Sequence, residues 1–205
     1  VPLGMLAALK HNSIWDSLAT ALATIGVSLP KFWFGLVLMI YFSLKWGLLP
    51  STGSADLMTD GPVEFLKHII MPGSALALGM AATQTRMIRS SMLDVLGQDY
   101  VRYARSKGLK EKAVIWGHAF KNAMIPVITV IGSEIGGLLG GAVVTESIFS
   151  WPGVGRLAVN SISKRDYPMI QGITLLLCTS YLLINLLVDI VYAWVDPRIR
   201  LDKKS

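Results

Sequence analysis

Residues 169–195 read MIQGITLLLCTSYLLINLLVDIVYAWV, and Asp196 and Pro197 follow at once. As an α-helix this stretch is long enough to cross a hydrocarbon core of about 30 Å, which needs about 20 residues. Its only acidic or basic side chain is that of Asp189. Helices usually end at or before the residue that precedes a proline. The stretch therefore predicts a membrane-spanning helix that ends at Val195.

Three further stretches are apolar and long enough to span a membrane, at about 18–44, 69–88 and 124–144. The first contains Pro30, where we expect one long helix to be kinked or locally unwound. Pro72 and Pro126 are expected in the first turns of the second and third helices, because a missing N–H costs little there. With residues 169–195, the sequence predicts an all-α integral membrane protein with four spans.

The composition excludes an ordinary soluble domain. Hydrophobic residues make up 53% of the chain and charged residues only 16%, against about 25% charged residues in soluble domains. The single Cys178 rules out an internal disulfide and a cysteine-based metal site, and the histidines are too far apart in sequence to show ligand spacing. No phosphate-binding G-x-x-x-x-G-K-S/T loop, H-E-x-x-H or G-x-S-x-G motif is present. We expect no metal or cofactor and no enzymatic activity.

The net charge of +6 reflects membrane topology better than nucleic-acid binding. Residues 86–121, between the second and third spans, carry eight basic and three acidic side chains. The segments on the other side, 46–68 and 147–168, carry four of each. Basic residues concentrate on the cytoplasmic side of membrane proteins. Both ends of the chain and the segment 86–121 are therefore predicted to face the cytoplasm.

A helix, a glycine turn and a second helix are predicted on this cytoplasmic side, within residues 98–123. Asp99 can cap a short helix from Tyr100 to Lys107. Gly108 follows where a left-handed residue is needed. A second helix is expected to start near Lys110 and to lead into the third span. A partner that grips the short helix could pass its motion to the spans on either side.

Residues 99–109, DYVRYARSKGL, with Ile125 and Pro126 downstream, resemble the EAA loop of binding-protein-dependent ABC importer permeases. Ala104 and Gly108 match its E-A-A-x-x-x-G pattern, whereas Arg102 and Tyr103 replace the Glu and the first Ala. That departure resembles the dipeptide and oligopeptide branch of the family. The runs IFSWPGVGR at 148–156, RDYP at 165–168 and DPRIR at 196–200 resemble the B-type peptide permeases of that branch.

The resemblance implies a six-span type I permease fold of the MetI-like family. Residues 1–195 would belong to this ABC transmembrane type-1 domain, and residues 196–205 would form a cytoplasmic tail. The opening Val1-Pro2-Leu3-Gly4 looks like the exit from the family's second span. The chain is therefore expected to be truncated at its N-terminus and to lack the first two spans.

The resemblance also implies a function. It predicts a permease subunit that forms half of the pathway for dipeptides or oligopeptides, in a bacterial or archaeal cell (inner) membrane. The expected partners are an extracytoplasmic substrate-binding protein, a C-type sister permease, two ABC ATPase subunits that hydrolyse ATP, and the lipid bilayer; no nucleic acid is expected. The same importer class also carries nickel complexes or glutathione. A less favoured alternative is an ion-coupled secondary transporter that uses Glu134 or Asp189.

The residues expected to couple the subunit to its ATPases lie in and just after the short helix. Among them the cationic Arg102, Arg105 and Lys107 could meet an acidic groove on an ATPase. The full set is Asp99, Arg102, Tyr103, Ala104, Arg105, Lys107, Gly108 and Leu109.

Two further features concern the spans. Gly132, Gly136 and Gly140 are spaced by four residues and predict a face for close helix packing, within the subunit or against a second permease. Glu134 points away from this face, and it could line the pathway or make a structural hydrogen bond. Arg86 and Arg89, at a span end, are expected to anchor the helix at the membrane interface.

Overall fold

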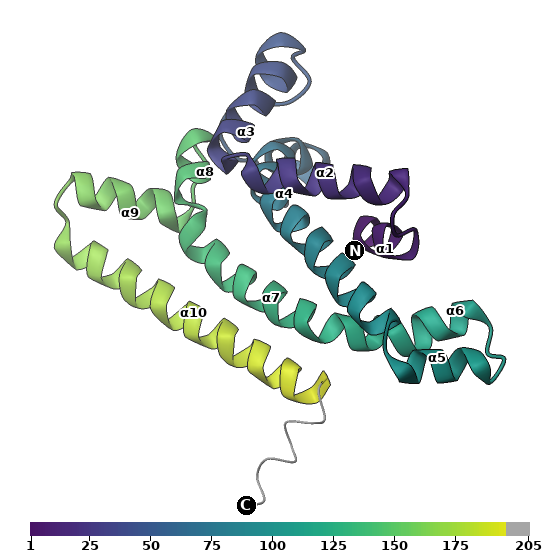
Figure 1. The fold of residues 1–205 in the computed structure, drawn as a ribbon. Helices are drawn as coiled ribbons and strands as arrows, with labels where there is room; N and C mark the ends of the chain where they lie inside the picture. The colour runs from purple at the N-terminus through teal and green to yellow at the C-terminus, as the bar shows by residue number, and fades with distance from the viewer. Residues whose placement is uncertain (196–205) are drawn as a thin grey trace, which may run out of the picture. The chain divides into compact units, whose positions relative to one another are not determined.

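The computed structural model describes residues 1–195, with side chains throughout that range except at 139–141 and 192–195. Every regular element in this range is a helix (Figure 1). In chain order they are α1 (Pro2–Leu9), α2 (Ile14–Ser28), α3 (Lys31–Leu38), the π-helical η1 (Met39–Lys45), α4 (Gly61–Leu96), α5 (Asp99–Ser106), α6 (Glu111–Ala113), the π-helical η2 (Val114–Ala119), α7 (Phe120–Gly141), α8 (Val143–Ile148), α9 (Val154–Ser163) and α10 (Tyr167–Val195). The predicted all-α fold is confirmed.

Three stretches of continuous helix are long and apolar enough to cross a membrane: Gly61–Leu96, Glu111–Leu138 and Tyr167–Val191. A fourth span results if the bent pair Ile14–Ser28 and Lys31–Lys45 is counted as one. The chain is therefore a multi-pass membrane protein. The predicted end of the last span at Asp196 and Pro197 lies outside the described residues.

The helix expected over 18–44, kinked or locally unwound at Pro30, is interrupted at that proline, which is the stronger of the two expected distortions. The structure has two separate helices, α2 and α3, with Leu29 and Pro30 between them. Pro30 has extended backbone angles, φ −61° and ψ 130°, and precedes the first residue of α3. Proline lacks the N–H that would continue the hydrogen bonds of α2, and it forces the residue before it away from helical angles. These two effects end α2 and do not merely bend it.

Helix α4 begins eight residues before the predicted span and ends eight residues after it. Its 36 residues are about 54 Å long at 1.5 Å per residue, well beyond a core of about 30 Å. Hydropathy detects only the part of a helix that suits lipid, and no proline or glycine breaks the helix between Met87 and Leu96. Pro72 consequently lies inside α4, which corrects its predicted place in a first turn.

Pro126 likewise lies inside α7, and not in the first turn of a helix as predicted. The helix that contains it starts at Glu111 and passes without a break through α6, η2 and α7. Prolines are tolerated inside membrane helices because neighbouring groups satisfy the freed carbonyls. The predicted second helix from near Lys110 into the third span is confirmed.

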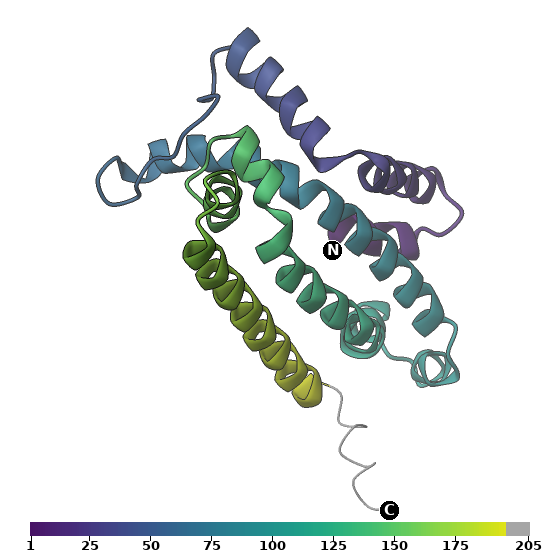
Figure 2. The same ribbon diagram turned by 90° about the vertical axis from the view of Figure 1, so that its left-hand side faces the viewer.

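The chain divides into two compact units. The first contains residues 1–26 and 81–134 and the part of α10 from Ile184. Its core joins α1, α4 and the η2–α7 helix, and consists of Met5, Ala8, Ile88, Met92, Ala119, Ala123 and Val127. Figures 1 and 2 both show α1 against the C-terminal half of α4, with the start of α7 alongside.

The second unit contains residues 27–80 and 135–183. Its buried core is Met71, Ala75 and Phe149, and apolar side chains of α3 and η1 pack against it. The N–H of Gly53 donates to the carbonyl O of Phe149 at 2.9 Å, which ties the loop between η1 and α4 to the end of α8. The loop between η1 and α4 and the turn that follows α8 are therefore both fixed to this small core.

Candidate functional site

The helix, glycine turn and helix predicted at 98–123 are present within the first unit. Helix α5 ends at Ser106, and Lys107 and Gly108 make the turn. Gly108 has φ +76°, in the left-handed region that glycine adopts without a steric penalty. Its N–H donates to the carbonyl O of Arg105 at 2.9 Å, and the Lys107 N–H donates to that of Tyr103 at 3.1 Å. The predicted left-handed turn at Gly108 is confirmed.

Asp99 does not cap this helix, so that prediction was wrong. The preceding Gln98 has extended backbone angles, and its side chain makes no capping hydrogen bond. The carbonyl O of Gln98 accepts the N–H groups of Val101 and Arg102 at 3.1 and 3.3 Å, which starts the helix one residue earlier than predicted. Asp99 is then the first helical residue, where its negative charge still stabilises the helix by its interaction with the positive end of the helix dipole.

One face of α5 is buried. Val101 and Ala104 pack with Val114 of η2, and Val95 and Leu96 at the end of α4 complete the cluster. Val101 and Val114 are fully buried, and Ala104 is 7% exposed. Because this cluster joins three elements, α5 cannot move without displacing the end of α4 or the start of the helix that becomes α7.

An ion pair closes the turn at Gly108. The Arg105 guanidinium donates from Nη2 to Oε1 of Glu111 at 2.8 Å, and its Nε lies 3.2 and 3.3 Å from the two carboxylate oxygens. Hydrogen bonding from its guanidinium to Glu111 raises the pKa of Arg105 above its usual value. Of the three cations predicted to meet an acidic groove, Arg105 is therefore already paired within the segment.

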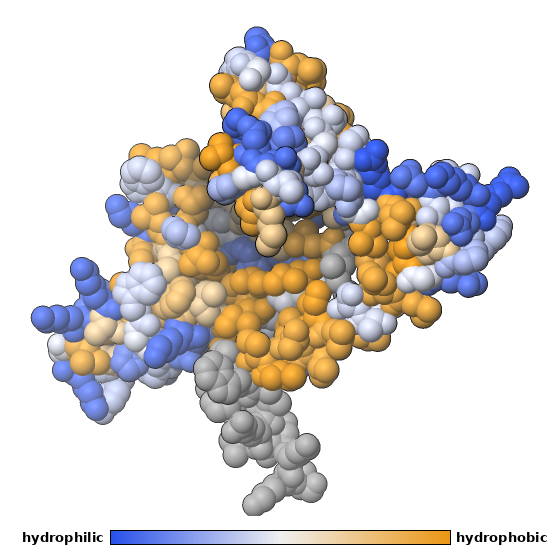
Figure 3. Space-filling model, turned by 180° about the vertical axis from the view of Figure 1, so that it is seen from behind, coloured by the Kyte–Doolittle hydropathy of each residue, from blue (hydrophilic) through white to orange (hydrophobic). Residues whose placement is uncertain are grey.

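The opposite face of α5 is open. Tyr103 is 63% exposed, and Nζ of Lys107 lies 4.7 Å from the centroid of its ring. Arg102 is exposed and makes no salt bridge within residues 1–195. Leu109 is also exposed. In Figure 3 hydrophilic residues cover the lower-left end of the molecule, where α5 and α6 lie. The exposed face of α5 thus combines cations with the large aromatic ring of Tyr103.

Tyr100 is a contact that the sequence analysis missed. Its hydroxyl accepts a hydrogen bond from Nδ2 of Asn122 at 2.8 Å, which joins the start of α5 to the start of α7. Asn122 also donates to the carbonyl O of His118, in η2. No spacing rule relates residues 22 positions apart in separate helices, so the sequence carried no signal for this bond.

Glu134 makes a hydrogen bond between two spans. Nε2 of Gln84 on α4 donates to its Oε2 at 2.7 Å, and both residues belong to the first unit. The other amide atom, Oε1 of Gln84, is buried and has no hydrogen-bond partner within the described part of the chain. Asp189, the other acidic residue considered as an ion site, is exposed on α10.

The glycines of α7 have different surroundings. A Cβ atom on Gly132 would lie 2.2 Å from Cγ1 of Val188, so only glycine allows α7 and α10 to approach this closely. Gly136 is also buried. Gly140 belongs to α7, but its surroundings lie outside what the structure describes.

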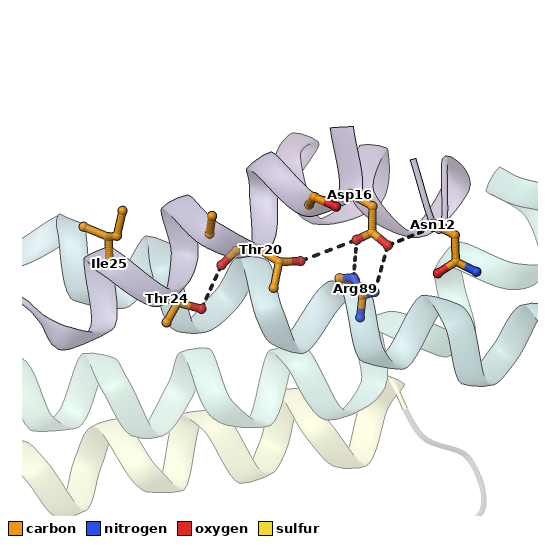
Figure 4. Close-up of a pocket in the computed structure, with 8 residues that line it drawn as sticks. Asn12, Asp16, Thr20, Thr24, Ile25 and Arg89 are labelled. Carbon is orange, nitrogen blue, oxygen red and sulfur yellow. Dashed lines mark hydrogen bonds and ion pairs between the residues drawn. The ribbon is translucent and has the colours of Figure 1, made fainter. Parts of the chain in front are cut away.

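A buried ion pair joins α2 to α4. Asp16 is only 4% exposed, and its Oδ1 and Oδ2 accept hydrogen bonds from Nε and Nη2 of Arg89 at 2.5 and 2.9 Å. Oδ2 also accepts the N–H of Asn12 at 3.1 Å and lies 3.0 Å from Nδ1 of His11. Figure 4 shows the pair in a groove of about 630 Å³ along α2, with Thr20 and Thr24 on the same side. Arg89 therefore connects two helices, a role that the predicted membrane anchor did not include.

Part of this arrangement has a sequence signal. Ser13 precedes α2 and Asp16 is three residues further on, a spacing typical of a helix start. The N–H of Asp16 does lie 3.4 Å from Oγ of Ser13. The pattern could have placed the start of α2, but not the partner of Asp16, because Arg89 is 73 residues away.

No group of three or more metal-ligating side chains lies together within residues 1–195. The site therefore consists of a packed helix with an exposed cationic and aromatic face, and of two polar contacts between spans. Such a surface can bind a partner and transmit its motion.

Comparison with known proteins gives a consistent match. Residues 1–201 match the model of a family described as binding-protein-dependent transport system inner membrane component. The chain is 45% identical to the dipeptide transport system permease protein DppB of Escherichia coli K12, over 98% of this chain and 66% of that protein. It is 42% identical to a di/tripeptide permease protein of Pseudomonas aeruginosa and 44% identical to the oligopeptide permease protein AppB of Bacillus subtilis. These alignments cover 96% and 97% of this chain, and 64% and 63% of the relatives, so the chain spans less than two thirds of their length.

Proposed function

Because the chain belongs to the family of binding-protein-dependent transport system inner membrane components, we propose that it acts as a permease subunit of an ATP-driven peptide importer. The relatives are named as permease proteins for dipeptides, for di- and tripeptides, and for oligopeptides. Peptides are accordingly the proposed substrates. Nickel complexes and glutathione are competitors to be included in a transport assay.

The observation that carries the proposal is the geometry of α5. Its apolar face is locked to α4 and to the helix that becomes α7, whereas its other face is open and cationic. A partner bound to the open face would move both attached helices, since the buried cluster cannot separate without exposing apolar side chains. We propose that this partner is an ATPase, and that Asp99, Arg102, Tyr103, Ala104, Arg105, Lys107, Gly108 and Leu109 form the coupling segment.

Within this set the structure suggests separate roles. Arg102, Tyr103 and Lys107 are exposed and would contact the ATPase. Ala104 is buried, and its small side chain would let α5 lie close to its neighbours. Arg105 and Gly108 would hold the turn, one through the ion pair with Glu111 and the other through its left-handed backbone.

The proposed assembly has an extracytoplasmic binding protein, a C-type sister permease and two ATPase subunits. This subunit would supply half of the pathway, and ATP would be hydrolysed by the partners. Both ends of the chain and α5 would face the cytoplasm, which agrees with the excess of basic residues between 86 and 121. Glu134 would then contribute a polar group to the pathway or, through Gln84, a fixed contact between two spans.

The proposal is tested by reconstituting the full-length subunit in liposomes with the sister permease, the ATPases and the binding protein. We expect dipeptide uptake that requires ATP on the side of the membrane where the ATPases lie. Uptake should stop when either the ATPases or the binding protein is omitted. An excess of unlabelled oligopeptide, glutathione or nickel complex would show which substrate competes. Uptake driven by an ion gradient without the ATPases would contradict the proposal and favour a secondary transporter that uses Glu134 or Asp189.

A further inference from the structure

The carboxylate of Glu146, on α8, contacts the start of the next helix, α9. Its Oε2 accepts the backbone N–H of Arg156 at 2.8 Å. A Cβ atom on Gly153 would lie 2.1 Å from the Cδ atom of Glu146, and one on Gly155 would lie 3.1 Å from its Oε2. The carboxylate therefore occupies space that exists only because residue 153 is glycine, whereas a Cβ atom on Gly155 would first meet Val143, 2.6 Å from its Cγ2.

This contact replaces a helix cap. Gly153 precedes the first residue of α9 and has no side chain that could accept a hydrogen bond from the free N–H groups of the first turn. Glu146 supplies that acceptor from α8, and its negative charge also suits the positive end of the α9 dipole. The carboxylate thus does for α9 what an N-cap side chain does in most helices.

The turn between the two helices is closed by further hydrogen bonds. The N–H of Trp151 donates to the carbonyl O of Glu146 at 2.9 Å, and Nη1 of Arg156 donates to the carbonyl O of Ser150 at 2.6 Å. Phe149, which begins this turn, is 2% exposed in the core of the second unit. The direction of α9 is therefore set by one carboxylate acting on a turn that is anchored in a core.

The outer face of α9 is apolar and is bordered by positive charge. Val154, Leu157 and Ile162 are 39%, 44% and 61% exposed. A groove of about 380 Å³ lies along the first turns and is lined by Pro152, Gly153, Val154, Arg156, Leu157 and Asn160. Lys164 and Arg165 follow at the end of the helix and are exposed.

Positive charge at this place is unexpected from topology. Residues 147–168 lie on the proposed outer side, where basic side chains are normally scarce, yet three of their four charges are positive. A basic border around an apolar face suits a partner with an acidic surface, and charge complementarity of this kind steers association. In the proposed importer, the partner on that side is the binding protein.

We propose that Glu146 is a positioning residue, which through its contacts with Gly153 and with the N–H of Arg156 fixes α9 in the orientation that receives the extracytoplasmic binding protein. This inference rests on the proposed function. Glu146 itself does not contact the binding protein. It sets the position of the groove and of the basic border, so its loss weakens docking and leaves ATP hydrolysis by the docked complex intact.

The test uses the full-length subunit in the reconstituted importer and three variants: Gly153→Ala, Glu146→Ala and the double variant. The readout is the concentration of peptide-loaded binding protein that gives half-maximal ATPase stimulation, separately from the maximal rate. We expect Gly153→Ala to raise this concentration about fivefold or more, since the new methyl group displaces the carboxylate. The double variant is expected to equal Glu146→Ala, because its methyl group enters the space that the carboxylate has left.

Gly172→Ala is the matched control, since a Cβ atom there meets no atom within 4 Å. It should behave as wild type. Glu146→Gln keeps an acceptor oxygen and should recover most of the affinity that Glu146→Ala loses. A wild-type response of Gly153→Ala, or additive losses in the double variant, would overturn the inference, as would a fall in the maximal rate alone. If the assembled wild-type complex takes up no peptide at all, that result would instead contradict the proposed function.

Discussion

Replacement of Arg89 by alanine is expected to be the most destabilising change in the first unit. The side chain of Asp16 is 6% exposed and that of Arg89 27%, and two guanidinium hydrogen bonds join them. Removing the guanidinium leaves a buried carboxylate without its main counter-charge, which costs far more than the loss of an exposed pair. We expect the melting temperature of the purified full-length subunit in detergent to fall by roughly 5 °C or more.

Arg105→Ala is the matched control for this prediction. It also removes a guanidinium from a carboxylate, but the Arg105 and Glu111 side chains are 41% and 56% exposed, and such pairs contribute little to stability. Replacing both members of the buried pair, Asp16→Leu with Arg89→Met, should recover much of the lost stability because no charge is left unpaired. Equal melting temperatures for Arg89→Ala and Arg105→Ala would show that Asp16 is solvated in the protein and would contradict the prediction.

Gly108→Pro is expected to give the largest loss of transport. Proline fixes φ near −65°, whereas Gly108 has φ +76°, and proline also lacks the N–H that donates to the carbonyl O of Arg105. The turn between α5 and α6 cannot form in its present geometry. Stimulation of ATP hydrolysis by the peptide-loaded binding protein should fall about tenfold or more, because a small misplacement of positioned groups can cost such a factor. The complex should still copurify, since no side chain of the buried cluster changes.

Gly108→Asn provides the control for this change. Asparagine tolerates the left-handed region better than other non-glycine residues, and its N–H is retained. Most of the stimulated ATPase activity should therefore remain in this variant. The prediction fails if Gly108→Pro keeps wild-type stimulation, or if both substitutions reduce it equally.

Local sequence signals predicted the elements whose causes are local. The last helix was placed at 169–195 and is found at 167–195, because its length and apolar composition leave no alternative in a membrane. The turn at Gly108 was placed correctly because a left-handed residue after a short helix is usually glycine. The resemblance of residues 99–109 to the EAA loop gave the family, which the match over residues 1–201 supports.

The predictions of helix starts and ends failed where backbone groups, or helix preference outside the apolar stretch, determine where the helix begins or ends. Asp99 was expected as a cap, but the carbonyl group of Gln98 starts the helix and needs no side chain. Helix α4 extends past its apolar part because its polar ends form good helix outside lipid. Hydropathy cannot detect such extensions, since it measures preference for lipid and not for helix.

Two contacts between separate elements were also beyond the sequence. Arg89 was expected only as a membrane anchor, and it meets Asp16 because the start of α2 lies against α4. Glu146 had no predicted role, and its contact becomes visible only once α8 and α9 bring it against Gly153. A single sequence without its relatives does not show which residues of separate helices contact each other. Here the only local signal was the presence of glycines at 153 and 155.

The central claim, that the exposed face of α5 contacts an ATPase subunit, is tested most directly by cysteine cross-linking in the assembled full-length complex. Cys178 is exposed and would first be replaced by serine. A cysteine at Tyr103, which is 63% exposed, should then cross-link to the ATPase, whereas one at Val101, fully buried two residues earlier, should not. Cross-linking to the ATPase from position 103 alone is the predicted result. No cross-link from position 103 in a complex that transports peptides, or equal cross-linking from both positions, would contradict the account.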